Sequence, residues 1–292
     1  MKLYVMCGLP GSGKSTYAKS IDAEVISSDE IRINKYDSVM DQSHNGEVFA
    51  EVYKKANELL KTTDVLIDAT NTSKKMRAKL LNAIKTPCEK ICVVIPTEVN
   101  ECIRRRSAPD KDGKTVSKDV IMRYYRNFDI PCLEEGFDKI DIIGDCKFGL
   151  DDLMKITETM RDFDQNSPYH RYDLMSHCFL ATSYLVQEPR YKQDSSLYWA
   201  MFLHDIGKLF TGITDEKGIS HYPNHANVGA YELLSHGMTD LDLLFYVNNH
   251  TKAKDWTTEK LIKKYSEIYG EKKVRNLVMM SRCDEKAYGL ND

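Results

Sequence analysis

The chain of 292 residues lacks the features that mark several large classes of protein. It has no apolar run close to the roughly 20 residues that a membrane-spanning helix requires, so we expect no membrane partner. Its first residues carry one lysine and a short apolar stretch that runs into glycines, unlike a secretory signal. The formal net charge is only −3, which argues against a protein that coats nucleic acid through a large basic excess.

Paired cysteine motifs are also missing. The chain has 8 cysteines, but none of them forms a Cys-x-x-Cys pair. An even number of cysteines does not indicate disulfides in a chain of this length without a secretory signal. We therefore expect mostly buried thiols and a cytoplasmic location. Hydrophobic residues make up 42% and charged residues 29%, which is ordinary globular usage and excludes a disordered or collagen-like chain.

Histidine usage and hydrophobic periodicity divide the chain into two parts. Seven of the 8 histidines follow residue 150. Residues 1–148 alternate short β-prone runs with longer stretches of helical spacing, which predicts a parallel sheet flanked by helices. After Gly149 the strand signal fades and helical spacing dominates. We expect an α/β domain over residues 1–148 and an all-α domain over residues 149–292.

The first candidate site is the segment from Gly8 to Ser15, Gly-Leu-Pro-Gly-Ser-Gly-Lys-Ser, which fits G-x-x-x-x-G-K-[ST]. It follows an apolar strand and precedes a predicted helix, so its backbone N–H groups can surround a phosphate at a helix N-terminus. The motif assigns its lysine to the β and γ phosphates and its last hydroxyl to Mg²⁺. We therefore predict ATP and Mg²⁺ as cofactors. The predicted nucleotide-binding residues are Gly8, Gly11, Ser12, Gly13, Lys14, Ser15 and Thr16.

Two carboxylates and a basic segment add candidate chemistry to the first part. Asp68 ends a predicted strand at the carboxyl edge of the sheet, where it could hold a Mg²⁺-bound water or cap a helix. Asp29 follows another strand and could accept the proton of an attacking hydroxyl, or belong to a capping box. Arginines 104–106, followed by Lys111, Lys114 and Lys118, predict a basic lid over the phosphates, with a solvated charge run as the alternative.

Taken together, these segments resemble the P-loop kinases that include the phage-type polynucleotide 5′-kinases. The resemblance covers about residues 1–145 and rests on GLPGSGKST, SSDEIR, IDATN and the arginine-rich segment. It implies that Asp29 is the general base and that Arg32 holds the phosphate beside the attacking 5′-hydroxyl. It also implies that Arg105 contacts the nucleotide phosphates. Kinases of small molecules share much of this pattern.

The second candidate site is built on His204-Asp205, which ends an apolar stretch and precedes Ile-Gly-Lys. A lone His-Asp pair means little, but further histidines and an aspartate follow the same pattern. Imidazole and carboxylate groups together suit a divalent transition metal that activates water, such as Mn²⁺, Ni²⁺, Co²⁺, Zn²⁺ or Fe²⁺. The candidate ligands are His177, His204, Asp205, His225, His250 and Asp284.

This set matches the H…HD…H…H…D pattern of the HD phosphohydrolases over residues 166–292, and its details are similar to the HD module fused to some tRNA nucleotidyltransferases. The resemblance implies a first metal held by His177, His204, Asp205 and Asp284. His225 and His250 would complete a second metal site or hold substrate phosphate. The implied phosphate contacts are Lys208, His170 and His221.

A kinase and a phosphohydrolase in one chain would risk a futile cycle on a small metabolite, but they can act on different ends of a broken nucleic acid. The combination resembles bifunctional end-healing enzymes. We expect phosphorylation of 5′-hydroxyl ends and hydrolysis of 2′,3′-cyclic or 3′/2′-phosphate ends, on RNA in the first place and DNA in the second, with a separate ligase as partner. A nucleoside or metabolite kinase fused to an HD nucleotidase, and a non-catalytic ATP-sensing module, are the alternatives.

Overall fold

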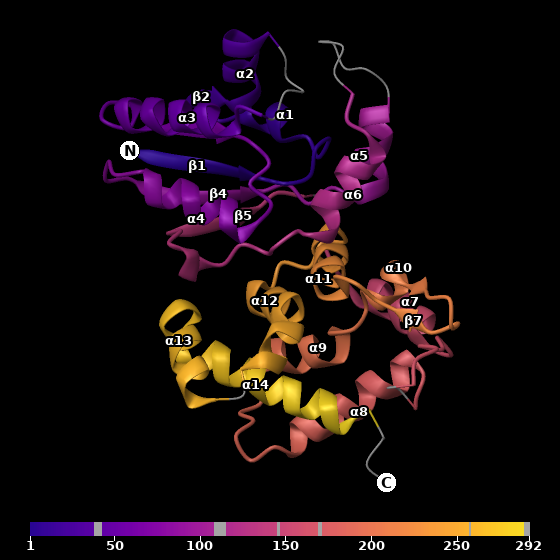
Figure 1. Cartoon of the computed structure of the whole chain (residues 1–292). Coiled ribbons are helices and arrows are strands. Elements are labelled where there is room, and N and C mark those ends of the chain that lie inside the picture. Colours follow the sequence, from indigo (N-terminus) through magenta and orange to yellow (C-terminus); the bar gives the residue numbers. More distant parts are fainter. Residues whose placement is uncertain (38–42, 108–114, 145–146, 169–170, 257, 289–292) are drawn as a thin grey trace. The chain divides into compact units, whose positions relative to one another are not determined.

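The chain folds into two compact units, which we describe separately. The computed structural model describes residues 1–37, 43–107, 115–144, 147–168, 171–256 and 258–288. Unit 1 consists of Met1–Tyr125 and Pro131–Asp145, and unit 2 of Arg126–Ile130 and Cys146–Asp292 (Figure 1). The segment 126–130 thus joins the second unit, although it lies within the first predicted domain. No described helix is long and apolar enough to cross a membrane.

Unit 1 contains a sheet of five strands in the order β2-β3-β1-β4-β5, and all neighbouring pairs are parallel. The central strand, β1, buries Leu3, Val5 and Met6 completely, as expected of a parallel strand that is covered on both faces. The predicted parallel sheet is therefore confirmed. The strands are β1 (Lys2–Cys7), β2 (Glu24–Ser27), β3 (Val65–Asp68), β4 (Glu89–Val94) and β5 (Lys139–Ile142).

Helices connect the strands of unit 1 and flank the sheet (Figure 1). β3 and β4 pair with opposite sides of β1, so the strand order changes direction at β1. In such sheets, ligands bind beyond the carboxyl ends of the strands at this switch point. The helical elements are α1 (Lys14–Ala18), α2 (Ser28–Tyr36), α3 (Asn45–Leu59), α4 (Lys74–Ala83), α5 (Val99–Ser107), α6 (Lys118–Arg126) and η1 (Leu133–Glu135).

Within its described residues, unit 2 is helical apart from one short antiparallel hairpin, β6 (Ile213–Thr214) with β7 (Ser220–His221). The sequence analysis expected only helices here and missed this hairpin, because two-residue strands are too short for an alternating pattern. The helical elements are α7 (Leu150–Met160), α8 (Leu174–Gln187), α9 (Ser195–Leu203), α10 (Lys208–Thr211), α11 (His225–Ser235), α12 (Leu241–Asn249), η2 (His250–Asp255), α13 (Glu259–Tyr269) and α14 (Glu271–Lys286).

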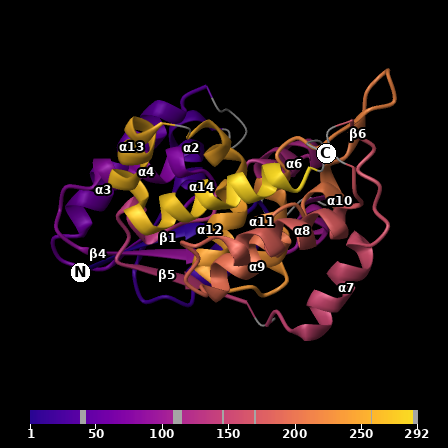
Figure 2. The ribbon, with the colours of Figure 1, turned by 90° about the horizontal axis from the view of Figure 1, so that it is seen from below.

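Local sequence explains where the helices of unit 2 begin. Asp173, Asp194 and Asp240 precede α8, α9 and α12, and each side chain accepts a hydrogen bond from a backbone N–H of the first turn. Helix α9 packs against α8 and α12, and α14 packs against α8 (Figure 2). Helix α14 also packs against η2. This grouping brings distant parts of the sequence to one buried centre.

Candidate functional site

The loop between β1 and α1 in unit 1 folds around the side chain of Lys14. The Nζ atom donates to the carbonyl oxygens of Gly8 (2.9 Å) and Leu9 (2.7 Å). Gly11 and Gly13 have φ angles of 87° and 99°, a left-handed conformation that glycine adopts without steric cost. Burial lowers the pKa of Lys14 to about 8, against the opposing charge of Asp68. The loop thus holds a buried cation at the carboxyl edge of the sheet.

The remaining nucleotide-binding residues lie in the same loop and at the start of α1. Ser12 is buried, whereas Ser15 and Thr16 are exposed. The backbone N–H of Thr16 donates to the carbonyl of Gly13 (3.1 Å) and continues the loop into α1. The hydroxyl of Ser15 is therefore accessible to a ligand.

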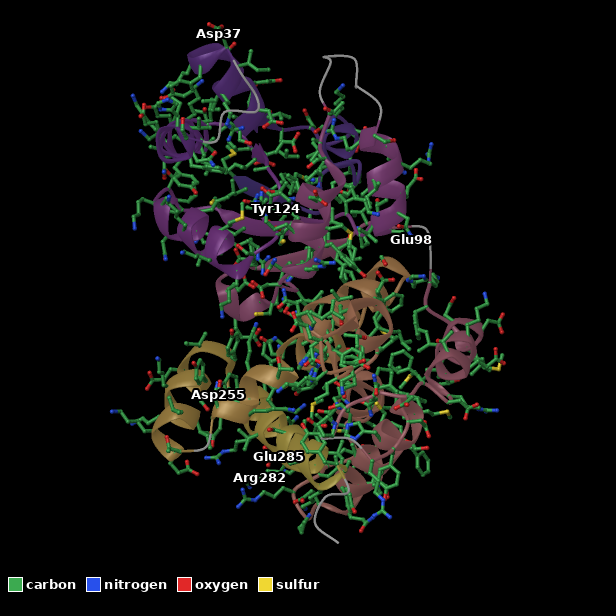
Figure 3. The ribbon with its side chains drawn as sticks, turned by 45° about the vertical axis from the view of Figure 1, so that its right-hand side comes forward. Asp37, Glu98, Tyr124, Asp255, Arg282 and Glu285 are labelled. Carbon is green, nitrogen blue, oxygen red and sulfur yellow. The ribbon has the colours of Figure 1, made fainter. Side chains whose placement is uncertain are left out.

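Helix α5 lies directly against this loop. An added Cβ atom at Gly11 would lie 2.7 Å from the carbonyl oxygen of Cys102. Arg105 donates from Nη1 to the carbonyl of Gly11 (3.3 Å) and from Nε to Glu101 (2.7 Å). Hydrogen bonds from Arg104 and Arg105 lower the pKa of Glu101 to about 2. In Figure 3, Glu98 marks the residue just before α5.

The structure thus places Arg105 beside the loop around Lys14. Lys111 and Lys114, which the sequence analysis assigned to the same lid, lie outside the described residues.

Asp29 and Arg32 form a pair on the first turns of α2. The Nη1 atom of Arg32 lies 2.9 Å from Oδ1 of Asp29, and its Nη2 donates to Asn45 (2.7 Å). The Asp29 side chain is 46% exposed, whereas that of Arg32 is 4% exposed. Among the described residues, the buried Nε of Arg32 has no hydrogen-bond partner. Ser27, not Asp29, caps the helix by accepting a hydrogen bond from the N–H of Glu30.

Asp68 lies at the same edge of the sheet as this pair. The register of β2 and β3 places Ser27 opposite Asp68, two residues before Asp29. The charge of Asp68 also acts on Lys14. Three carboxylate or ammonium groups with candidate roles therefore share the carboxyl edge of the sheet, where the phosphates of a nucleotide would lie.

A buried network that the sequence analysis did not find supports this edge. Arg77 and Glu135 form two hydrogen bonds of 2.7 Å, and their side chains are 0% and 1% exposed. Arg77 also donates to the carbonyl of Asn71 (3.1 Å), and Asn71 donates to the carbonyl of Met6 (2.9 Å). The network thus ties the loop after β3 to the end of β1. In the sequence, Arg77 fits the exposed face of a helix, so nothing there predicts that it is buried and paired with Glu135.

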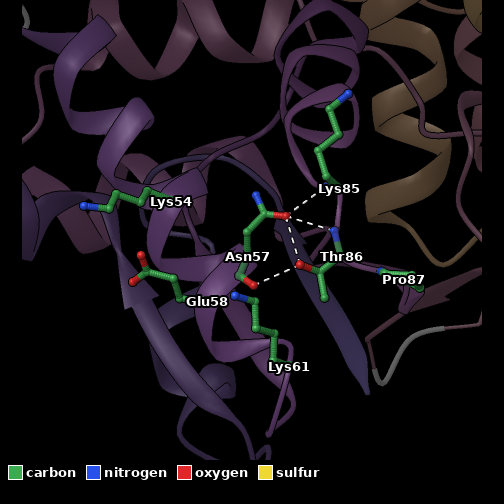
Figure 4. A pocket seen from close by; sticks show the side chains of 7 residues that line it. All are labelled: Lys54, Asn57, Glu58, Lys61, Lys85, Thr86 and Pro87. Carbon is green, nitrogen blue, oxygen red and sulfur yellow. Dashed lines mark hydrogen bonds between the residues drawn. The ribbon is translucent and has the colours of Figure 1, made fainter.

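Unit 1 also has a hollow of about 560 Å³ lined by residues of α3 and of the turn before β4 (Figure 4). The side chain of Asn57 accepts hydrogen bonds from the N–H groups of Lys85 (2.7 Å) and Thr86 (3.0 Å). These contacts tie the turn to the helix. Because the turn precedes β4, the hollow lies at the opposite edge of the sheet from Lys14, and it contains none of the predicted site residues.

The second candidate site brings together the six predicted ligands of unit 2, which we call the His/Asp cluster. They come from α8, the residues after α9, α11, η2 and α14. One group of donor atoms, all within 4.8 Å of one another, belongs to His177, His204, Asp205 and Asp284. Within it, Nε2 of His177 lies 2.9 Å and Nε2 of His204 lies 3.3 Å from Oδ1 of Asp284.

Asp205 is shared between this group and a second one. Its Oδ2 faces Nε2 of His177 (3.6 Å) and of His204 (3.4 Å). Its Oδ1 faces Nε2 of His225 (3.1 Å) and of His250 (3.4 Å), which complete the second group within 4.8 Å. One carboxylate thus lies between two sets of donors, which could each hold one ion.

The four histidines of the cluster are oriented in the same way. Each directs Nδ1 to a main-chain carbonyl and Nε2 into the cluster. Such bonds to Nδ1 fix the ring and leave Nε2 as the metal-binding atom. The Nδ1 partners are the carbonyls of Ala287 for His177 (3.2 Å), Met201 for His204 (2.7 Å), Tyr222 for His225 (2.8 Å) and Val247 for His250 (2.8 Å).

Two glycines explain how α11 comes close enough to place His225. An added Cβ atom at Gly207 would lie 1.9 Å from the carbonyl oxygen of His225 and 2.7 Å from the nitrogen of Gly229. An added Cβ atom at Gly229 would lie 2.9 Å from the nitrogen of Gly207. The backbone after Asp205 and the first turns of α11 therefore pack without intervening side chains.

Neighbouring charges and hydrogen bonds keep the two carboxylates of the His/Asp cluster ionised. Burial favours neutral Asp205, but the charges of His204 and Lys208 outweigh it and hold its pKa well below the usual value. The pKa of Asp284 is likewise held well below its usual value, against burial, by hydrogen bonds from neighbouring histidines. Burial lowers the pKa of His250 to about 4. Two ionised carboxylates beside imidazoles form a nitrogen and oxygen donor set that fits a divalent transition metal.

Of the predicted phosphate contacts in unit 2, Lys208 lies in the cluster. Its Nζ is 2.7 Å from Oδ2 of Asp205 and donates to Oε1 of Gln165 (2.6 Å). His221 lies on the hairpin, where its exposed side chain pairs with Asp215 (2.9 Å). His170 lies outside the described residues. Gln165 was not predicted as a site residue, because its contact with Lys208 joins positions 43 apart in the sequence.

Two further residues that contact the cluster were not predicted. Lys254 approaches Oδ2 of Asp284 (2.9 Å), and the hydroxyl of Tyr288 lies 3.3 Å from the same oxygen. The ring of Tyr288 also stacks on His177, with ring centroids 5.7 Å apart. Their only sequence signal is the helical spacing of four residues from His250 to Lys254 and from Asp284 to Tyr288.

Comparison with known proteins gives a match to unit 1. Residues 3–131 match a family model described as an AAA domain. Together with the parallel sheet and the loop around Lys14, this match fits a P-loop kinase-like fold, which implies binding of ATP and Mg²⁺.

Several solved structures are similar to parts of the chain. A chain of the Pnkp1/Rnl/Hen1 RNA repair complex is 27% identical, with a TM-score of 0.38 and coverage of 42% of both chains. Kti12 from Chaetomium thermophilum, in complex with ADP-AlF3, is 18% identical, with a TM-score of 0.39 and coverage of 52% of this chain and 94% of Kti12. A gluconokinase from Sinorhizobium meliloti 1021 is 14% identical, with a TM-score of 0.34 and coverage of 49% and 81%. The chain thus matches 42% of the length of the repair-complex protein.

Proposed function

We propose that the chain heals broken nucleic acid ends, RNA in the first place. Unit 1 would transfer phosphate from ATP to a 5′-hydroxyl, and unit 2 would hydrolyse a 2′,3′-cyclic or 3′/2′-phosphate. The observation that carries the proposal is the convergence of six histidines and aspartates in unit 2, in a chain whose other unit is a P-loop kinase-like domain.

In unit 1, the exposed carboxylate of Asp29 serves as general base for the attacking hydroxyl. Its salt-bridge partner Arg32 has a buried Nε without a partner among the described residues, which suits an arginine that also receives a phosphate. Lys14 and Arg105 stabilise the charge that develops on the transferred phosphoryl group. Ser15, with Asp68 through water, supplies an oxygen site for Mg²⁺.

In unit 2, His177, His204, Asp205 and Asp284 would hold one divalent ion. His225 and His250, with the other oxygen of Asp205, would hold a second ion or a substrate phosphate. A bound transition metal supplies Lewis acidity and lowers the pKa of a bound water. Lys208 and His170 contact the phosphate, and so does His221 once the substrate draws it from its pairing with Asp215.

The combination of activities supports nucleic acid ends as the substrate. One unit adds a phosphate and the other removes one, so both acting on the same small metabolite would only consume ATP. On a broken strand, each of the two reactions would act on a different end. A separate ligase would then join the healed ends.

The decisive experiment incubates the chain with ATP and an RNA that carries a 5′-hydroxyl and a 2′,3′-cyclic phosphate, and scores both ends. We expect 5′ phosphorylation with Mg²⁺ alone, and loss of the cyclic phosphate with Mn²⁺, Ni²⁺ or Co²⁺ in preference to Mg²⁺. Matched reactions contain a DNA of the same sequence or free nucleosides. Transfer to nucleosides only would replace the proposal with a metabolite kinase. Turnover of none of them would favour a non-catalytic ATP-binding module.

A further inference from the structure

We propose that Lys254 binds the internucleotide phosphate next to the scissile phosphate when the end of an oligonucleotide occupies the His/Asp cluster. The inference deepens the proposed phosphohydrolase function of unit 2 and rests on it. It commits that site to oligonucleotides rather than mononucleotides or other small phosphoesters.

The two oxygens of Asp284 face different surroundings. Oδ1 lies within 2.9 Å of Nε2 of His177 and 3.3 Å of Nε2 of His204, on the side of the proposed metal. Oδ2 lies 2.9 Å from Nζ of Lys254 and 3.3 Å from the hydroxyl of Tyr288. Lys254 therefore contacts the carboxylate oxygen that does not face the imidazoles.

Exposure distinguishes Lys254 from Lys208, the other lysine that contacts the cluster. The side chain of Lys254 is 37% exposed, whereas that of Asp284 is 5% exposed. Lys208 is only 6% exposed and is held between Asp205 (2.7 Å) and Gln165 (2.6 Å). Lys208 can meet only a phosphate that has entered the cluster. Lys254 borders both the cluster and solvent, so it can meet the part of a substrate that stays outside.

The position of Lys254 is fixed by two elements that also build the cluster. It belongs to η2, which begins at His250 and ends at Asp255, labelled in Figure 3. Its ammonium lies 5.2 Å from the centroid of the Tyr288 ring, just beyond the end of α14. The cation is thus held at the edge of the site before a substrate arrives.

Charge explains how Lys254 could exchange partners. A divalent cation on Oδ1 would share the negative charge of Asp284 and weaken its attraction for the ammonium. A lysine ammonium on its flexible stem can then turn toward a phosphate oxygen. The phosphate adjacent to the scissile one is the next negative charge along the same strand, and contacts between lysines and strand phosphates contribute much of the affinity for nucleic acid.

The test compares Lys254→Met, which removes the charge but keeps most of the side-chain length, with Lys252→Met as matched control. Lys252 lies on the same element, is 46% exposed and pairs with Asp129 instead of Asp284. The substrates are an oligoribonucleotide with a 2′,3′-cyclic phosphate, the same strand with a neutral methylphosphonate at the last linkage, and a nucleoside 2′,3′-cyclic phosphate. Lys254→Met should raise KM for the first on the order of tenfold, the value of one charged hydrogen bond. It should leave KM for the other two, and all kcat values, nearly unchanged.

Two measurements do not depend on turnover. Fluorescence anisotropy with a 3′-hydroxyl product strand should show the same loss of affinity for Lys254→Met, and none when the last linkage is a methylphosphonate. Elemental analysis should show an unchanged metal content. A fall in metal content with unchanged KM would overturn the inference, because Lys254 would then only hold Asp284 in place. Equal losses for the mononucleotide, or for Lys252→Met, would overturn it as well.

Failure of the proposed function itself has a different signature. In that case the wild-type chain hydrolyses neither the oligonucleotide nor the nucleoside cyclic phosphate. The anisotropy comparison still decides on Lys254, since it needs no hydrolysis: equal affinity of wild type and Lys254→Met for the charged strand would refute the inference.

Discussion

The two candidate sites are built in different ways. In unit 1, the atoms around the proposed phosphates come mainly from one continuous segment, Gly8–Ser15, whose glycine conformations allow the loop to close on Lys14. In unit 2, the donors come from five separate segments. The rings of His204, His225 and His250 are each oriented by a carbonyl three residues earlier, whereas that of His177 is oriented by the distant carbonyl of Ala287. A contiguous site depends on local backbone geometry, whereas a dispersed site depends on how helices pack. The two sites should therefore respond differently to mutation.

The largest effect should come from removing one central group of each site. Lys14→Ala should abolish 5′ phosphorylation and leave phosphoester hydrolysis intact. Asp205→Ala should do the reverse, because this carboxylate faces both donor groups of the His/Asp cluster. Each unit has its own core, so the untouched activity should stay within about twofold. Assays of both ends of one RNA, with circular dichroism to check folding, measure this. Loss of both activities in a folded Asp205→Ala protein would refute two independent sites.

A smaller effect should follow from Asp29→Ala. As general base, Asp29 serves the chemical step, so its loss should lower kcat on the order of 10²-fold or more. The dissociation constant for ATP should stay close to that of the wild type, because Asp29 contacts Arg32 rather than the phosphate loop.

Glu30→Gln is the matched control for this prediction, since Glu30 is an exposed neighbour on the same helix. Single-turnover kinetics and calorimetric titration with ATP separate the two quantities. Near-normal turnover by Asp29→Ala would contradict the general-base assignment and leave Asp29 with a structural role.

Packing should matter more in unit 2, and Gly207→Ala tests this. The added methyl group would overlap the carbonyl of His225, so we expect a loss of roughly 1–3 kcal/mol in the free energy of unfolding of unit 2. Hydrolysis should fall because His225 moves away from Asp205. Gly46→Ala, where nothing lies within 4 Å of the added atom, should be neutral or stabilising by about 1 kcal/mol. Thermal unfolding of both variants checks the contrast; equal midpoints would disprove it.

The smallest effect concerns pH and the buried ammonium of Lys14. Burial lowers its pKa to about 8, below the usual value of 10.5. The unfolded chain therefore binds this proton more tightly than the folded one. As pH falls from 10.5 toward 8, this difference lowers the free energy of unfolding. Bound phosphates favour the charged form, so ATP affinity should fall above pH 8, up to about tenfold per pH unit.

Calorimetric titration with ATP at several pH values measures this dependence. Lys14→Arg is the control, because an arginine stays charged over the whole range. A wild-type affinity that is flat between pH 7 and pH 9.5 would contradict the prediction.

Much of this molecule could be read from the sequence. The strand and helix alternation of the first part predicts the parallel sheet, because a strand buried on both faces leaves a continuous apolar run. The P-loop motif could be located because its geometry is local. The candidate ligands of unit 2 could be chosen only because their residue types and order resemble a known pattern; their spacing along the chain, from His177 to Asp284, carries no distance information.

Tertiary structure alone decided the rest. That Asp205 faces two donor groups depends on the close contact of Gly207 with Gly229, which lies beyond any local rule. The buried pair of Arg77 and Glu135 joins residues 58 positions apart, and in the sequence each reads as an ordinary surface charge. Lys254 contacts Asp284 because η2 packs against α14. Secondary structure follows from short-range periodicity. Contacts between elements follow from packing, and packing therefore decides which distant charged side chains pair.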